Sequence, residues 1–284
     1  MLGAIIGDMV GSIYEFHPIK TKDFEIIDQR MRMTDDSLLT IAVAKTLLSF
    51  YPFSFDEKYL KDIKKCLINN LVIAWQANKS AGFGGMFYNW CQKLLNGGEP
   101  EPYNSYGNGS AMRISPVGWL ANSEEEVKIL SKTVTEVTHN HPEGLKGAEA
   151  VAMCIYLARN GASKEQIKER MVNDYYPEIK DLDFDDLVKH YEFSEICQKS
   201  VPQAIYCFLI SNSLEDAIRN CIAIGGDCDT TGAMAGAIAE AYYQKDELSP
   251  FEEEYLYWMI DRETEELIKK LHKTIGSHKF EDKR

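Results

Sequence analysis

The chain has 284 residues, 45% of them hydrophobic, so it is long enough to bury a substantial core. Its net charge of -13 argues against a nucleic-acid-binding protein, because contact with a phosphate backbone needs a basic surface and no basic stripe is present. No apolar run approaches the ~20 residues that a membrane span needs, and residues 1–9 lack the basic start of a signal peptide. Seven cysteines without a C-x-x-C pair favour a reducing environment, so we expect a cytoplasmic monomer without membrane contact.

The first expected helix lies within residues 2–16 and carries three glycines four residues apart. Glycine costs a soluble helix up to about 1 kcal/mol relative to alanine, so Gly3, Gly7 and Gly11 favour close packing against another helix. Asp8 and Glu15 are seven residues apart and share one helical face. A buried acidic face needs compensation, which a cation would supply, although each acid taken singly also fits a solvated position.

The next element is an almost wholly apolar helix over residues 38–48, preceded by Thr34, Asp35 and Asp36. Helix capping explains one such residue well and three in succession poorly. Adjacent carboxylates at a buried helix end repel each other unless something positive lies between them, and the helix dipole alone is too weak. This cluster is therefore a candidate cation site.

In the middle of the chain, the apolar spacing predicts helices over 56–77, 86–95, 123–137 and 163–172, which we expect to be structural. The last two begin with N-cap patterns at Ser123 and Ser163. Residues 104–113 are rich in glycine and small polar residues before a helix expected at about Ser110, which suits phosphate binding but also a plain turn. His139 and His141 lack a third zinc ligand at matching spacing, so ligand contact is the better reading for His139. Residues 174–191 are expected to be an acidic surface insertion.

Helices over 194–210 and 213–222 lead to a second acidic cluster. Asp227, Asp229 and Thr230 fall within four residues, after Gly225 and Gly226 and before a small-residue helix over 233–243. Carboxylates and a hydroxyl on one turn suit a magnesium-like cation. A last amphipathic helix is expected over 251–271, and no stretch alternates like a strand. We therefore expect an all-α orthogonal bundle, with one domain over residues 1–284.

Six motifs in chain order resemble the ADP-ribosylglycohydrolase family, which includes dinitrogenase reductase-activating glycohydrolase and ADP-ribosyl-acceptor hydrolases. The matching segments are Gly7-Asp8 with Gly11 and Glu15, Thr34 to Asp36, Gly82-Phe83-Gly84, Ser105 to Arg113, Thr138-His139, and Gly225 to Thr230 through Gly232. The family often has Arg-Gly-Tyr-Gly where this chain has Ala81, Gly82, Phe83 and Gly84. The resemblance therefore does not indicate which residues of this chain contact the acceptor.

The resemblance implies a helical hydrolase with two magnesium ions, manganese being an alternative, acting on an ADP-ribosylated protein or a small ADP-ribose conjugate. Nucleic acid is expected only as a modified substrate. The implied metal ligands are Thr34, Asp35, Asp36, Asp227, Asp229 and Thr230. The implied substrate-binding residues are Gly82, Gly84, Ser105, Tyr106, Gly107, Asn108, Gly109 and His139, with Tyr106 near the adenine and the Ser105–Gly109 loop at the diphosphate.

Two cations ~3.5 to 4 Å apart can orient the ribose hydroxyls and a water for attack on the anomeric carbon. The departing acceptor needs a proton, and Glu15 and Asp35 are both candidates for supplying it. An acidic pocket suits a guanidinium leaving group, so arginine-linked ADP-ribose is the first expected substrate. The alternatives are a two-metal hydrolase of another nucleotide or conjugate and a non-catalytic ADP-ribose-binding protein.

Overall fold

Helices make up almost all of the regular structure. The computed structural model describes residues 1–243 and 248–277, where the only β-type pairing is an antiparallel bridge between Gly107 and Ile196. The α-helices are α1 (Leu2–Gly11), α2 (Asp35–Phe50), α3 (Glu57–Ala77), α4 (Gly85–Leu95), α5 (Ser115–Leu120), α6 (Glu124–Thr135), α7 (Pro142–Arg159), α8 (Lys164–Asp174), α9 (Phe184–His190), α10 (Cys197–Leu209), α11 (Leu214–Ile224), α12 (Cys228–Tyr242), α13 (Pro250–Glu254) and α14 (Arg262–Thr274). Two 3-10 helices, η1 (Asn108–Ser110) and η2 (Pro177–Asp181), and one π-helix, η3 (Tyr255–Met259), complete them.

The expected all-α class is confirmed by these elements. The described residues contain fourteen α-helices, and their apolar side chains form one contiguous core. None of these helices combines the length and apolarity needed to cross a bilayer. The domain extent over 1–284 stays a prediction, since residues 244–247 and 278–284 lie outside the described residues.

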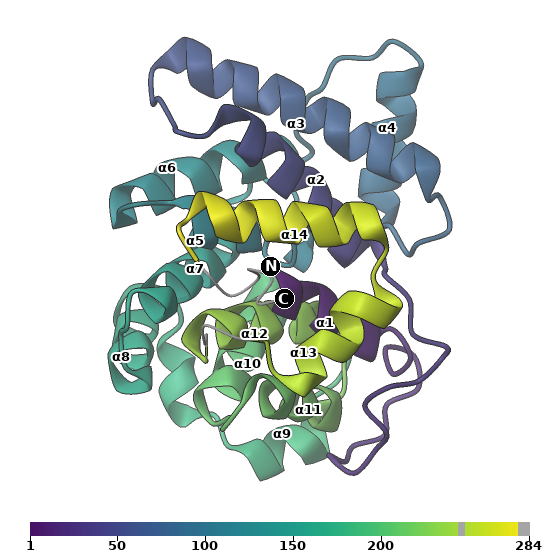
Figure 1. Cartoon of the computed structure of the whole chain (residues 1–284), viewed down its shortest axis with the longest axis vertical. Coiled ribbons are helices and arrows are strands. Elements are labelled where there is room, and N and C mark those ends of the chain that lie inside the picture. Colours follow the sequence, from purple (N-terminus) through teal and green to yellow (C-terminus); the bar gives the residue numbers. More distant parts are fainter. Residues whose placement is uncertain (244–247, 278–284) are drawn as a thin grey trace, which may run out of the picture.

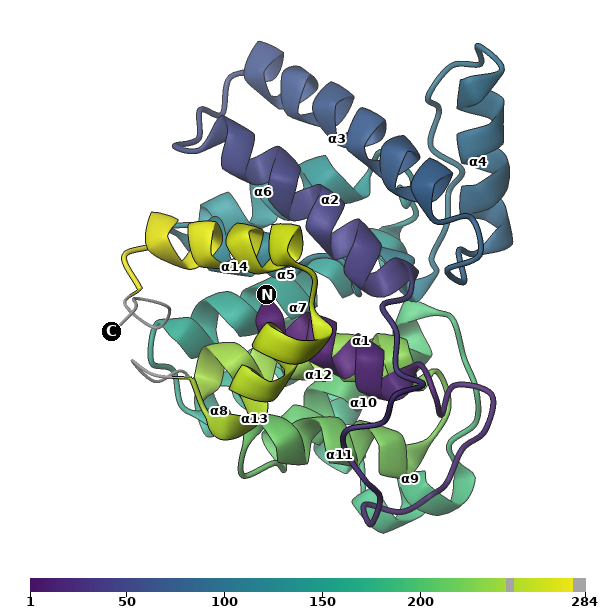
Figure 2. The ribbon, with the colours of Figure 1, turned by 45° about the vertical axis from the view of Figure 1, so that its right-hand side comes forward.

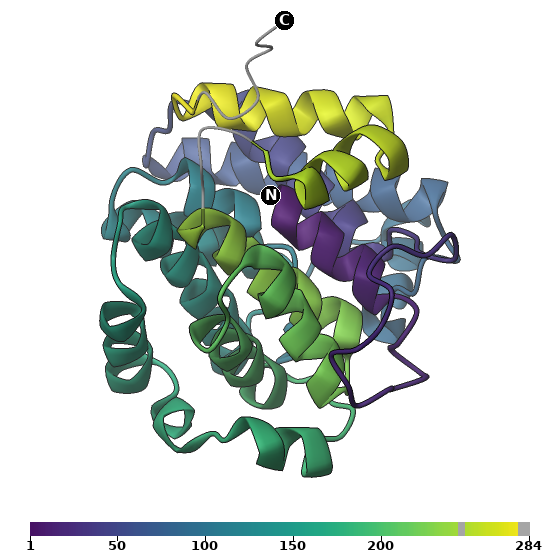
Figure 3. The same cartoon turned by 60° about the horizontal axis from the view of Figure 1, so that its bottom comes forward.

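Two of the helices that carry acidic motifs, α1 and α12, form a central pair enclosed by the others (Figures 1 and 2). Helices α2, α3 and α4 lie at one end of the molecule, and α9, α10 and α11 lie toward the other. Figure 3 shows α1 beside α12, its main packing partner. The pairing places residues from the start and the end of the sequence next to each other.

Glycine on both helices permits this close approach. A Cβ atom added to Gly7 would overlap the carbonyl of Gly232, and one on Gly3 would overlap the carbonyl of Gly236. A Cβ on Gly11 would overlap the backbone of Asp229. The glycine stripe is therefore a helix-packing surface, as expected from its spacing, and it brings the C-terminal part of α1 against the first turn of α12.

Several expected helix boundaries are wrong. Helix α12 begins at Cys228 rather than at 233, and α1 ends at Gly11, so Glu15 lies beyond the helix that carries Asp8. The single helix expected over 251–271 is divided into α13, η3 and α14. Ile260 is extended (φ -99°, ψ 137°), and the Asp261 side chain restarts the helix by accepting hydrogen bonds from the Thr264 backbone N–H at 3.0 Å and the Thr264 hydroxyl at 2.7 Å. The helix expected to open at Ser110 is only the short η1, and α5 begins at Ser115.

The expected helix starts at Ser163 and Ser123 behave differently from each other. At Ser163 the reciprocal capping box with Gln166 is complete. At Ser123 the hydroxyl caps Glu126, but the Glu126 carboxylate accepts from the Asn122 backbone N–H at 2.8 Å instead of closing the box. Both residues nevertheless begin a helix where the pattern predicted one.

Candidate active site

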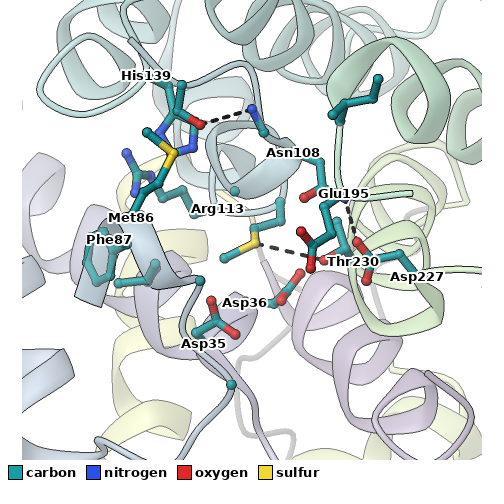
Figure 4. Close-up of a pocket in the computed structure, with 18 of the residues that line it drawn as sticks. Asp35, Asp36, Met86, Phe87, Asn108, Arg113, His139, Glu195, Asp227 and Thr230 are labelled. Atoms are coloured by element: carbon teal, nitrogen blue, oxygen red, sulfur yellow. Dashed lines mark hydrogen bonds between the residues drawn. The ribbon is translucent and has the colours of Figure 1, made fainter. Parts of the chain in front are cut away.

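One cavity of about 350 Å³ brings together the segments singled out in the sequence. Figure 4 shows Asp35 and Asp36 facing Asp227 and Thr230, with His139 farther along the wall. The predicted site residues that line it are Glu15, Asp35, Asp36, Gly82, Gly84, Ser105, Tyr106, Gly107, Asn108, Gly109, His139, Asp227, Asp229 and Thr230. Thr34 is the one predicted residue that does not line it.

Two sets of acidic side chains at one end of this cavity have the spacing of metal ligands. One oxygen from each of Asp8, Asp36 and Asp229 lies within 4.8 Å of the others, and the same holds for Glu15, Asp227 and Asp229. Asp229 belongs to both sets. Asp36 has a buried oxygen, Oδ1, that receives no hydrogen bond from the described residues, as a ligand oxygen would require.

Asp8 is fully buried and ties α1 to the start of α2. Its carboxylate accepts hydrogen bonds from the Thr34 backbone N–H at 2.9 Å and the Thr34 hydroxyl at 2.6 Å. The backbone N–H of Ser37 donates at 3.1 Å, and the Ser37 hydroxyl donates as well. Thr34 therefore lies behind Asp8 and caps α2, and its assignment as a metal ligand stays a prediction.

The ligand candidates on α12 are held at its first turn. Asp227 accepts a 2.7 Å hydrogen bond from the Asn108 side chain, and Asp229 accepts one at 2.9 Å from the Thr230 backbone N–H. The Thr230 hydroxyl lies 3.9 Å from the sulfur of Met112. Both aspartates remain buried and line the cavity, so each keeps an oxygen for a further ligand.

Burial and mutual repulsion perturb these carboxyls strongly. Burial and the charges of Asp229 and Asp8 raise the pKa of Asp36 and of Asp35 well above the ordinary value. Burial raises the pKa of Asp227 to about 6, and burial, Asp229 and Glu195 raise the pKa of Glu15 to about 7. None of these carboxyls forms an ion pair with lysine or arginine in the described chain, so a cation would relieve the repulsion.

The other end of the cavity is a backbone loop fixed by hydrogen bonds. The Ser105 hydroxyl accepts from the Gly107 backbone N–H at 3.0 Å. The Asn108 backbone N–H donates to the Glu195 carbonyl at 2.8 Å, and the Cys197 N–H donates to the Tyr106 carbonyl at 3.0 Å. These bonds hold the loop open toward the cavity without any ligand.

The ADP-ribosylglycohydrolase family model matches residues 1–279. The chain belongs to this family. It is 26% identical to the ADP-ribosylhydrolase ARH3 of Mus musculus, over 86% of this chain and 82% of that protein. It is 25% identical to the ADP-ribosylarginine hydrolase Tri1 of Pseudomonas putida (strain GB-1), over 91% of this chain and 73% of that protein.

A solved structure named ADP-ribosylglycohydrolase-related protein complex has the same fold. It matches with a TM-score of 0.68 at 21% identity and covers 96% of this chain and 97% of that one. Membership in the ADP-ribosylglycohydrolase family confirms the resemblance found from the motifs. The protein is accordingly a glycosidic-bond hydrolase that removes ADP-ribose from an acceptor.

Several residues of the site were not among the predicted site residues. Asp8, which the sequence marked only as part of an acidic face with Glu15, could have been chosen as a ligand, because it is the one acid in the otherwise apolar stretch from Leu2 to Val10. Phe193 and Glu195 also line the cavity. Nothing in their sequence indicated this, since they follow the segment expected to be a surface insertion. That segment is partly buried, and the Tyr191 ring lies against Gly226 beside the second acidic cluster.

Proposed function

We propose that the protein is a magnesium-dependent hydrolase that releases ADP-ribose from modified proteins or small conjugates, with arginine-linked ADP-ribose as its first substrate. The observation that carries this proposal is the convergence of Glu15, Asp35, Asp36, Asp227 and Asp229 at one end of a single cavity, with the buried Asp8 within 4.8 Å of Asp36 and Asp229. A buried group of like charges is costly unless a cation neutralises it.

The donor set fits magnesium because every candidate ligand is a carboxylate or hydroxyl oxygen. The two overlapping sets that share Asp229 support two ions, and manganese would suit the same oxygens. When bound, such ions would supply Lewis-acid activation and orientation of the substrate oxygens. Asp8, Asp36, Asp227 and Asp229 would hold them, and Glu15, the remaining member of the second set, is assigned to the proton instead.

The protein's own acids would handle the proton and the developing positive charge. Glu15 is half-buried at the cavity, and burial and the charge of Asp229 raise its pKa to about 7 in the metal-free protein, so we assign it the proton for the departing acceptor. Asp35 lines the same cavity with a pKa raised above its usual range. Ionised neighbours would stabilise the oxocarbenium-like sugar in the transition state.

The rim of the cavity supports a cationic acceptor. Glu195 lines it without forming an ion pair in the described residues, and Phe193 lines it as well. The exposed rings of Phe16 and Phe193 stack with centroids 6.0 Å apart. A guanidinium pairs with carboxylates and stacks on aromatic faces, and one relative, Tri1, is named as an ADP-ribosylarginine hydrolase.

The test is release of ADP-ribose from arginine-linked, serine-linked and nucleic-acid-linked conjugates, each with magnesium and with EDTA. We expect the fastest release from the arginine conjugate and none with EDTA. Release that survives EDTA would contradict the metal requirement, and preferential release from serine would contradict the acceptor assignment. Tight binding of ADP-ribose without release from any conjugate would instead support a binding protein.

A further inference from the structure

Arg113 is a fully buried arginine whose role is not explained by the cavity alone. Its side chain is 1% exposed, and its one hydrogen bond in the described residues runs from Nη2 to the Thr138 hydroxyl at 2.7 Å. Its Nε and Nη1 atoms are buried without a partner there. Burying a guanidinium with unsatisfied N–H groups costs free energy, and an apolar side chain would fill the same space at a lower cost.

The bond from Arg113 determines which way the Thr138 hydroxyl points. Arginine has donors and no acceptor, so the Thr138 oxygen must accept, and its own proton must go elsewhere. Two acceptors are near: Nδ1 of His139 at 2.8 Å and the Thr135 carbonyl at 3.5 Å. The Thr135 carbonyl already accepts from the backbone N–H groups of Thr138 and His139, and 3.5 Å is long for a hydroxyl donor.

The Thr138 hydroxyl therefore donates its proton to Nδ1 of His139. The Tyr103 hydroxyl is a competing acceptor close to Thr138, but it has no hydrogen-bond partner within the described residues, whereas His139 Nδ1 lies at 2.8 Å. Burial and the charge of Arg113 hold the pKa of His139 well below its usual value, so the ring is neutral. A neutral imidazole that accepts at Nδ1 carries its proton on Nε2.

The Nε2 atom faces the cavity at the glycine loop. His139 is 6% exposed, and a Cβ atom added to Gly109 would lie 3.4 Å from Nε2, or 3.8 Å if added to Gly107. No protein group within the described ranges accepts a hydrogen bond from Nε2. The proton on Nε2 is thus available to an acceptor oxygen of a bound ligand.

We propose that Arg113 is a positioning residue that acts through Thr138 to keep His139 as a hydrogen-bond donor at Nε2, directed at an anionic or hydroxyl oxygen of the ligand. The directional chain runs from Arg113 to Thr138 to His139 and ends in the cavity. The inference rests on the proposed function only for the identity of the ligand, since the position of the ring proton is measured without any ligand.

The test reads the His139 tautomer by long-range ¹H–¹⁵N correlation on protein labelled with ¹⁵N-histidine, with His139→Gln to assign the signal among the six histidines. In the unaltered protein we expect the proton on Nε2. Thr138→Ser keeps the hydroxyl and should keep this tautomer, and Tyr103→Phe should keep it too. Thr138→Val removes the donor and should give a mixture, and Arg113→Gln, whose amide can accept, should do the same.

Calorimetric titration with ADP-ribose supplies the second readout. Loss of one oriented hydrogen bond should weaken binding about 10-fold in Thr138→Val and hardly at all in Thr138→Ser. A proton on Nδ1 in the unaltered protein would overturn the proposal, as would a Thr138→Val variant with unchanged tautomer. If Arg113→Gln does not fold, the comparison of Thr138→Val with Thr138→Ser still tests the proposal. Failure of the unaltered protein to bind ADP-ribose, with the Nε2 proton in place, would count against the proposed function alone.

Discussion

The two ends of the cavity differ in whether their polar groups are already paired within the protein. At the acidic end, carboxyls from α1, α2 and α12 are buried against one another with raised pKa values and no ion pair among the described residues. At the loop end, Gly107, Asn108 and His139 are held by backbone and side-chain hydrogen bonds. The acidic end is electrostatically incomplete without a cation, whereas the loop end is already organised. Changes at the two ends should therefore fail in different ways.

The largest effect is expected for Asp229→Asn, because Asp229 is shared by both sets of candidate ligands. Turnover should fall at least ~1,000-fold and magnesium binding should weaken in calorimetry. The fold without metal should be no less stable, because one repelling charge is removed from the cluster. Asp62→Asn, at an exposed position on α3, is the control and should behave as the unaltered protein. Near-normal turnover in Asp229→Asn would remove the basis of the proposed metal site.

Gly7→Ala tests how the acidic end is assembled. The added Cβ would overlap the Gly232 carbonyl, so α1 and α12 must separate, and Asp8 would move away from Asp229. Unfolding should become easier by about 3 kcal/mol, as for other overpacked sites, with weaker magnesium binding. Chemical denaturation measures the first effect. Gly85→Ala, where a Cβ meets nothing within 4 Å, should leave stability nearly unchanged, and equal stability of the two variants would contradict the close packing.

How much of this could be predicted from the sequence depends on whether the signal is local. The glycine spacing on α1 and the cap at Ser163 are local, and both predictions are confirmed. The approach of Asp36 to Asp229 spans nearly two hundred residues and was predicted because both motifs needed a counter-charge.

The remaining parts depend on tertiary contacts. Glu195 reaches the cavity because its carbonyl receives the Asn108 N–H from a distant loop, which no periodicity in its own segment indicates. The motif placed Arg113 near the site, but its role could not be predicted, because its partner Thr138 becomes a neighbour only in the folded chain. The break at Ile260 was missed because an Asp261 cap inside a charged amphipathic stretch resembles a surface residue.

The pH dependence of stability should separate the two ends further. A carboxyl whose pKa is higher in the folded protein than in the unfolded chain stabilises the fold at low pH, and this contribution is lost as pH rises through the folded pKa. With pKa values of about 6 for Asp227 and about 7 for Glu15, the metal-free protein should lose stability between about pH 4 and pH 7. Magnesium should reverse this loss.

Thermal melting in EDTA and in magnesium, at pH 5 and pH 7.5, measures this difference. The increase in Tm on adding magnesium should be larger at pH 7.5 by about 5 °C or more, and the pH effect should shrink in Asp229→Asn. Burial and Arg113 hold the pKa of His139 below that of the unfolded chain, so His139 acts in the opposite direction and adds stability as pH rises through about 6.5. This contribution is the same with and without magnesium and cancels in the comparison. A magnesium effect of equal size at both pH values would show that the carboxyls are not protonated in the metal-free state.

The smallest effect is expected at the rim, for Glu195→Gln. Glu195 is exposed, so its attraction for a guanidinium is screened by water and salt, and removing its charge should reduce release from arginine-linked ADP-ribose only about 3-fold. Release from a neutral serine-linked conjugate should not fall, because that acceptor carries no charge, and the effect on the arginine conjugate should shrink further at high salt. The ratio of the two rates under matched conditions is the measurement, with Glu192→Gln, an exposed neighbour outside the cavity lining, as the control. An equal fall for both conjugates would mean that the charge of Glu195 acts through its repulsion of Glu15 rather than on the acceptor.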